Sequence, residues 1–144
     1  MNDQINITKI IVTNADLVWT AISGIDGIDR WFPIIADCSV LGTGEGAIRL
    51  ITLADGGKIK DRIELIDHKQ QILRYNRVES PFSVQRYIGT VQVCKESDVS
   101  AKLSWTIDID VQEVHRDELH GLIYQAISDG IDGLASELQR LNRI

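Results

Sequence analysis

The sequence is poor in cysteine and in clustered basic residues, and each shortage excludes a class of protein. Its two cysteines, Cys38 and Cys94, stand far apart without C-x-x-C spacing, so no disulfide framework is indicated and two buried thiols are expected. A net charge of −6 with no basic run longer than two residues argues against nucleic-acid binding. No apolar stretch approaches the roughly 20 residues of a membrane-spanning helix, and the N-terminus lacks the pattern of a secretory signal. We therefore expect a soluble, cytoplasmic protein.

Residues that bind metals or phosphates are also sparse or unsuitably spaced. His115 and His120 could share a helix, but their offset does not align them, and His68 is remote in sequence. The glycine-rich stretch GTGEG at 42–46 lies between two predicted strands and does not open a helix, so it predicts a hairpin turn and not a phosphate loop. We expect no metal site and no cofactor.

What the sequence does contain is typical of one globular domain, predicted over residues 1–144, with 44% hydrophobic and 25% charged residues. Apolar alternation predicts a first strand over 4–12, followed by short helices over 15–23 and 27–32, with Gly24 closing the first helix. From Cys38 onward the period falls to two, and short turns separate the β-rich runs, which predicts an antiparallel meander. Its six strands are predicted over residues 37–41, 47–53, 58–67, 71–78, 84–95 and 99–111.

The last segment changes period again. Over residues 117–141 apolar residues recur at spacings of three and four, which predicts a helix long enough to cross a whole sheet. The predicted fold class is therefore α+β, a curved seven-stranded antiparallel sheet wrapped around a long C-terminal helix, with two short helices after the first strand. Gly121, Gly130 and Gly133 are unusual inside a helix. Close approach of another element, room beside the helix, and tolerance of a surface glycine all remain open as explanations.

Polar residues on the inward face of the sheet are the candidate functional residues. In the strand 58–67, Asp61 shares its face with Ile59, Ile63 and Leu65, so its carboxylate is predicted to point inward. A buried unpaired charge is costly, so Asp61 needs a cation, a donor, water or a ligand. Arg49, if it faces inward, is the natural counter-ion of Asp61 and the natural grip for a carboxylate-bearing ligand, but the parity of its strand leaves its direction open.

Aromatic residues supply further candidates. Tyr87 shares a face with Gly89 and offers a hydroxyl on an apolar body, either in the core or in a pocket. Trp105 lies on the apolar face of the last strand, either packed against the final helix or in a pocket wall. Trp31 and Phe32 are predicted to be exposed on the second short helix and to cap one end of a cavity.

Two segments of the chain carry a family likeness, WFPIIADCSVLGTGEGAIRLITLADGGKIKDRIELID and YNRVESPFSVQRYIGTVQV. The most specific residues are Gly44 and Gly46, Arg49, Asp55-Gly56, Asp61-Arg62-Ile63 and Asp67. With these residues the chain resembles the polyketide cyclase/dehydrase and lipid-transport family of the START-like superfamily, which includes the birch-pollen allergen.

This resemblance implies a helix-grip fold with a pocket between sheet and helix. It also implies that Asp61, usually Glu in the family, points into the pocket, that Tyr87 lines it, and that the turn 53–57 corresponds to the loop that gates the pocket in plant abscisic-acid receptors. Those receptors are distant relatives whose gate proline and ligand-binding lysine have no equivalent here, so hormone recognition does not carry over. Fold alone does not fix an activity.

The residues and the resemblance leave three functions open. The first is binding of a small hydrophobic or amphipathic ligand, for transport or sensing, by a monomer or weak homodimer. The second is a cyclase or dehydratase in which Asp61, its basicity raised by apolar surroundings, is the general base. The third is a protein-interaction module that uses an exposed patch around Trp31 and Phe32. The predicted ligand-binding residues are Trp31, Arg49, Asp61, Ile63, Tyr87, Gly89, Trp105, Ile123 and Ile127.

Overall fold

A computed structural model describes residues 2–82 and 84–141 of the chain. These residues contain seven strands and three helices, in the order β1 (Asn2–Ile11), α1 (Ala15–Ser23), α2 (Ile28–Trp31), β2 (Ile35–Leu41), β3 (Ile48–Leu53), β4 (Lys58–Asp67), β5 (Ile72–Glu79), β6 (Val84–Ser97), β7 (Ser100–Val111) and α3 (Glu113–Leu141).

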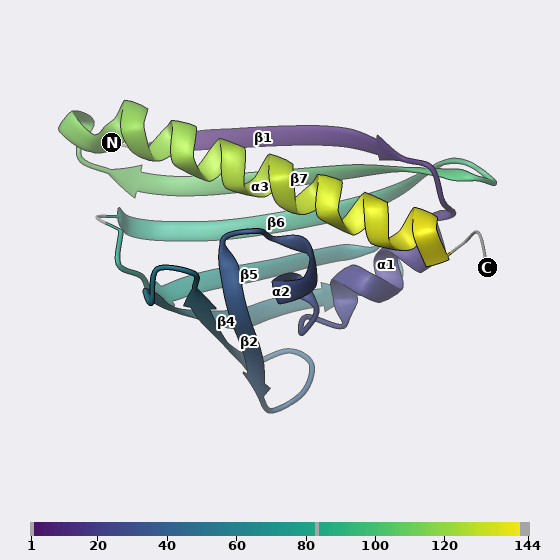
Figure 1. The fold of residues 1–144 in the computed structure, drawn as a ribbon, viewed down its shortest axis with the longest axis horizontal. Helices are drawn as coiled ribbons and strands as arrows, with labels where there is room; N and C mark the ends of the chain where they lie inside the picture. Colours follow the sequence, from purple (N-terminus) through teal and green to yellow (C-terminus); the bar gives the residue numbers. More distant parts are fainter. Residues whose placement is uncertain (1, 83, 142–144) are drawn as a thin grey trace.

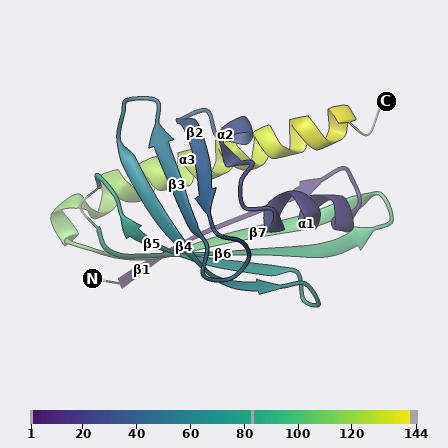
Figure 2. The same cartoon turned by 90° about the horizontal axis from the view of Figure 1, so that it is seen from below.

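The strands form one antiparallel sheet in the order β1-β7-β6-β5-β4-β3-β2. Strands β2 to β7 are a meander, and β1 closes the order by pairing with β7. Figures 1 and 2 show the long helix α3 lying across one face of the curved sheet, with α2 beside it. The predicted helix-grip fold is therefore confirmed.

Helix boundaries follow from local chemistry. The side chain of Asn14 accepts a hydrogen bond from the backbone N–H of Leu17 and caps α1, and Gly24 ends that helix as predicted. Helix α3 begins four residues earlier than the predicted start at residue 117. Its first turn carries an exposed Val114, so the apolar periodicity on which the prediction rested does not extend to the true start.

The alternation of buried residues along the strands places the core between the sheet and α3. In β4, Ile59, Asp61 and Ile63 are buried as predicted, but the register shifts between Ile63 and Leu65. Because of this bulge, Ile66 packs against the core in place of Leu65. Cys94 is exposed, so the prediction of two buried thiols is wrong for this residue.

Two glycines explain how closely α2 approaches α3. A Cβ atom added at Gly133 would overlap the backbone of Trp31, and one added at Gly130 would overlap the ring of Phe32. Trp31 and Phe32 are consequently buried, with 3% and 6% of their surface exposed, and the prediction that they are exposed is wrong. Gly121, in contrast, has open space around its Cβ position.

No helix among the described residues is long and apolar enough to span a membrane.

Candidate functional site

A cavity of about 590 Å³ lies between the sheet and α3. Its wall is mostly apolar, with side chains from β3, β4 and β7 facing side chains from α3. Representative lining residues are Ile51, Leu53, Ile59, Trp105, Ile123 and Ile127. A cavity of this size and character is typical of sites for small organic molecules.

The cavity opens where several of its lining residues reach the surface. Ile34, between α2 and β2, and Leu122, on α3, both line the cavity and are 43% and 52% exposed. Leu53, Ala54 and Asp55 of the β3–β4 turn also line it. The opening therefore combines apolar side chains with a turn whose position matches the one implied by the family resemblance.

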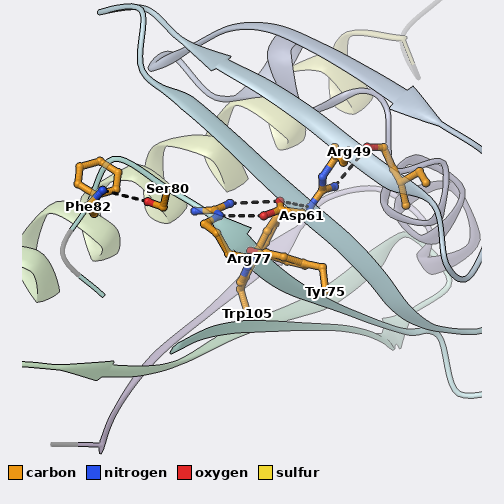
Figure 3. A network of polar contacts seen from close by, with 8 residues as sticks. Arg49, Asp61, Tyr75, Arg77, Ser80, Phe82 and Trp105 are labelled. Atoms are coloured by element: carbon orange, nitrogen blue, oxygen red, sulfur yellow. Dashed lines mark hydrogen bonds and ion pairs between the residues drawn. The ribbon is translucent and has the colours of Figure 1, made fainter. Parts of the chain in front are cut away.

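One part of the wall is polar, because Arg49 and Arg77 line it. Both arginines contact Asp61, which lies beneath them and is 0% exposed. Its Oδ2 accepts a hydrogen bond from Nη2 of Arg49 at 3.2 Å. Arg77 donates from Nε to Oδ1 at 2.9 Å and from Nη2 to Oδ2 at 3.3 Å. Figure 3 shows Asp61 between the two arginines. We call Arg49, Asp61 and Arg77 the Arg-Asp-Arg cluster.

This cluster carries two positive charges and one negative charge, hence a net charge of +1 next to an apolar cavity. Burial by itself raises the pKa of Asp61, but Arg77 and Arg49 together outweigh burial and hold that pKa below its ordinary value of 3.8. The prediction that the surroundings raise the basicity of Asp61 is therefore wrong. Three donated hydrogen bonds also occupy its carboxylate, which leaves it poorly suited to accept a proton from a substrate.

Aromatic rings hold the two guanidinium groups in place. The guanidinium carbon of Arg77 lies 4.2 Å from the ring centroid of Tyr87, and that of Arg49 lies 4.9 Å from the ring centroid of Tyr75. Nε1 of Trp105 donates to the hydroxyl of Tyr75 at 3.2 Å. Burial raises the pKa of both tyrosines, so their hydroxyls are neutral at physiological pH.

The structure divides the predicted site residues into two groups. Side chains that line the cavity are Arg49, Tyr87, Trp105, Ile123 and Ile127. Arg49 therefore faces inward, which resolves the direction that its strand parity left open.

The other four predicted residues, Trp31, Asp61, Ile63 and Gly89, do not line the cavity. Asp61 is buried beneath its two arginines, and Ile63 belongs to the core. Trp31 packs against α3, where its indole N–H donates to the carboxylate of Glu137. The space beside Gly89 is filled by the ring of Tyr75, its partner across β5 and β6.

Sequence reasoning missed Arg77 and Tyr75, both of which line the cavity. The signal was present in the strand 72–79. Leu73, Tyr75 and Arg77 occupy every second position and so share one face, and Leu73 and Tyr75 are buried. Applying to this strand the parity argument used for Asp61 would have identified both residues.

The sequence matches a known family over nearly its whole length. A model of the polyketide cyclase/dehydrase and lipid transport family matches residues 3–139. The chain belongs to this family. No curated protein matches the sequence.

Several solved structures of the family's fold are similar to the chain along nearly its whole length. The protein XoxI from Bacillus cereus shares 24% identity and a TM-score of 0.86, covering 96% of this chain and 97% of that chain. The Zhui aromatase/cyclase from Streptomyces sp. R1128 shares 17% identity and a TM-score of 0.86, covering 97% and 95%. Norcoclaurine synthase from Thalictrum flavum, in complex with dopamine and hydroxybenzaldehyde, shares 17% identity and a TM-score of 0.81, covering 97% and 88%. At these identities the similarity establishes the fold.

Proposed function

We propose that this family member binds a small, mainly apolar molecule in the cavity between the sheet and α3, for transport or sensing. The observation that carries the proposal is the cavity of about 590 Å³ itself, enclosed by apolar side chains and interrupted on its wall by the Arg-Asp-Arg cluster. An apolar cavity releases free energy when it takes up an apolar molecule, and a few polar groups then fix the orientation of that molecule.

Binding is favoured over the cyclase or dehydratase reaction because of the state of Asp61. Its carboxylate is ionised, fully buried and hydrogen-bonded by two arginines, and it does not line the cavity. A general base must reach the proton that it removes. The patch on which an interaction module would depend is also missing, because Trp31 and Phe32 are buried.

We also propose that the protein acts in the cytoplasm as a monomer or weak homodimer and does not bind nucleic acid. The net charge of −6 supports the last point because it opposes contact with phosphate backbones. Size-exclusion chromatography with light scattering at several protein concentrations tests the oligomeric state.

Native mass spectrometry of protein purified without denaturant tests the binding function. The variant Ala126→Phe places a large side chain on the cavity wall, while Glu118→Phe adds the same side chain at an exposed position of the same helix. We expect a bound small-molecule mass on the wild type and on Glu118→Phe, and a reduced bound fraction on Ala126→Phe. Equal bound fractions on all three proteins would place any ligand outside the cavity and contradict the proposal.

A further inference from the structure

The Arg-Asp-Arg cluster has a charge imbalance that a ligand could complete. Arg49 and Arg77 share a single carboxylate, and the side chains of these three residues are 3%, 13% and 0% exposed in the order Arg49, Arg77, Asp61. Desolvated charges without a counter-charge are unfavourable, so one positive charge remains to be balanced at this wall. An anion in the cavity, where Arg49 and Arg77 both line the wall, would balance it.

The cluster also has an unused donor. Arg49 donates from Nη1 to the backbone carbonyl of Ile25 and from Nη2 to Asp61, but its buried Nε has no hydrogen-bond partner among the described residues. Buried donors in folded proteins almost always have a partner. The unbalanced charge points to a negatively charged group, and the missing partner points to a hydrogen-bond acceptor. A carboxylate supplies both.

Among the described residues, no other basic side chain lines the cavity. Two acidic side chains line it, and neither is fully buried. Asp55 is exposed in the β3–β4 turn, and Asp129 is partly buried and accepts a hydrogen bond from Gln125. The cavity is therefore asymmetric, with positive charge at the buried wall and apolar surface over most of the remainder. A ligand that matches both features has an apolar body and one anionic end.

We infer that the cavity takes an amphipathic organic acid, whose carboxylate contacts the guanidinium groups of Arg49 and Arg77 while its apolar body lies against Ile51, Ile59 and Ile127. This inference rests on the proposed binding function and adds the chemical class of the ligand. The rings of Tyr75 and Tyr87 hold the arginines in position for this contact.

The test compares acids with neutral alcohols of the same shape by isothermal titration calorimetry at pH 7. The pairs are decanoate with 1-decanol, 4-phenylbutyrate with 4-phenylbutan-1-ol, and 2-naphthylacetate with 2-naphthylethanol. We expect at least one acid to bind about tenfold or more tightly than its alcohol, because hydrogen bonds between charged partners are stronger than neutral ones. An uncharged apolar cavity would give the opposite order, since a carboxylate loses more hydration than a hydroxyl.

Two variants of β5 provide the matched control. Arg77→Met and Arg74→Met each remove one positive charge, but Arg74 is exposed and does not line the cavity. Arg77→Met should abolish the preference for the acid, and Arg74→Met should leave it unchanged. Asp61→Asn, which raises the net charge of the cluster, should increase the preference. Comparing acid with alcohol inside each variant separates charge recognition from a general change in cavity shape, and circular dichroism verifies that each variant is folded.

The outcomes distinguish the inference from the proposed function. If alcohols bind as tightly as acids to the wild type, the ligand class is wrong while cavity binding stands. If no member of any pair binds, the ligand class is wrong, and native mass spectrometry of Ala126→Phe and Glu118→Phe decides separately whether cavity binding stands. Acetate is the final probe. Tight binding of acetate would show a site for small anions that needs no apolar body, and this would also overturn the inference.

Discussion

Arg49 and Asp61 are direct partners across the antiparallel pair of β3 and β4, and their side chains meet at 3.2 Å on the inner face of the sheet. Register therefore places both residues on one face, and the curvature of the sheet turns that face toward α3 (Figure 2). Arg77 joins them from β5, where it is the register partner of Asp61. Three neighbouring strands thus each contribute one member of the Arg-Asp-Arg cluster.

Asp61→Asn should destabilise the fold at neutral pH, by about 3–5 kcal/mol if it behaves like other broken buried ion pairs. The pKa of Asp61 is lowered in the fold, so its ionised form contributes stability above the ordinary value of 3.8, and this contribution is lost as the pH falls through the lower folded value. Urea unfolding between pH 7 and pH 2.5 measures both effects.

The difference between wild type and Asp61→Asn should accordingly shrink below about pH 4. Asp117→Asn is the control, because its side chain is 98% exposed and lies outside the cluster. A free energy of unfolding for Asp61→Asn that equals the wild-type value at pH 7 would contradict the assigned role of the carboxylate.

Gly133→Ala should lower the free energy of unfolding by about 1–3 kcal/mol or more, because the added methyl group would overlap the backbone of Trp31. Gly121→Ala lies in the same helix with open space at its Cβ position, so the better helix propensity of alanine should raise stability by up to about 1 kcal/mol. Thermal unfolding of the two variants would show opposite shifts, and shifts of the same sign would mean that α2 does not pack as described.

Glu137→Ala should loosen the contact between α2 and α3. The carboxylate of Glu137 accepts hydrogen bonds from Nε1 of Trp31 and from Nε of Arg30, the latter at 3.0 Å. Removing it leaves the indole N–H of the buried Trp31 without this partner, at a cost of about 1–3 kcal/mol. Hydrogen exchange should report faster exchange in residues 28–32, while Glu118→Ala, exposed on the same helix, should leave their exchange unchanged.

The two thiols should react at very different rates. Burial raises the pKa of Cys38 to about 11, whereas Cys94 is exposed on β6. At pH 8 the thiolate fraction of Cys38 is on the order of 0.1%, which makes it a slow nucleophile. Ellman's reagent should label one thiol quickly and the second slowly, and Cys94→Ser should remove the fast phase. Loss of the slow phase in that variant would reverse the assignment.

The overall architecture was predictable from the sequence because it depends on period and turn chemistry. The change from alternation to a three-and-four spacing distinguishes the strands from α3, and short turns permit only antiparallel neighbours. The inward direction of Asp61 followed from the same periodicity, since Ile59 and Ile63 flank it on one face. These are local properties, and tertiary contacts did not override them.

Only the tertiary structure decided which residues form the cavity wall. Asp61 and Arg49 share an inward face, yet Arg49 lines the cavity and Asp61 lies beneath it, because Arg77 arrives from a strand sixteen residues away and covers the other side of the carboxylate. Trp31 is likewise buried only because Gly133, about a hundred residues later in the chain, leaves room for its backbone. Periodicity gives the direction of a side chain from its own strand or helix, whereas its neighbours in space come from elements that no local pattern connects.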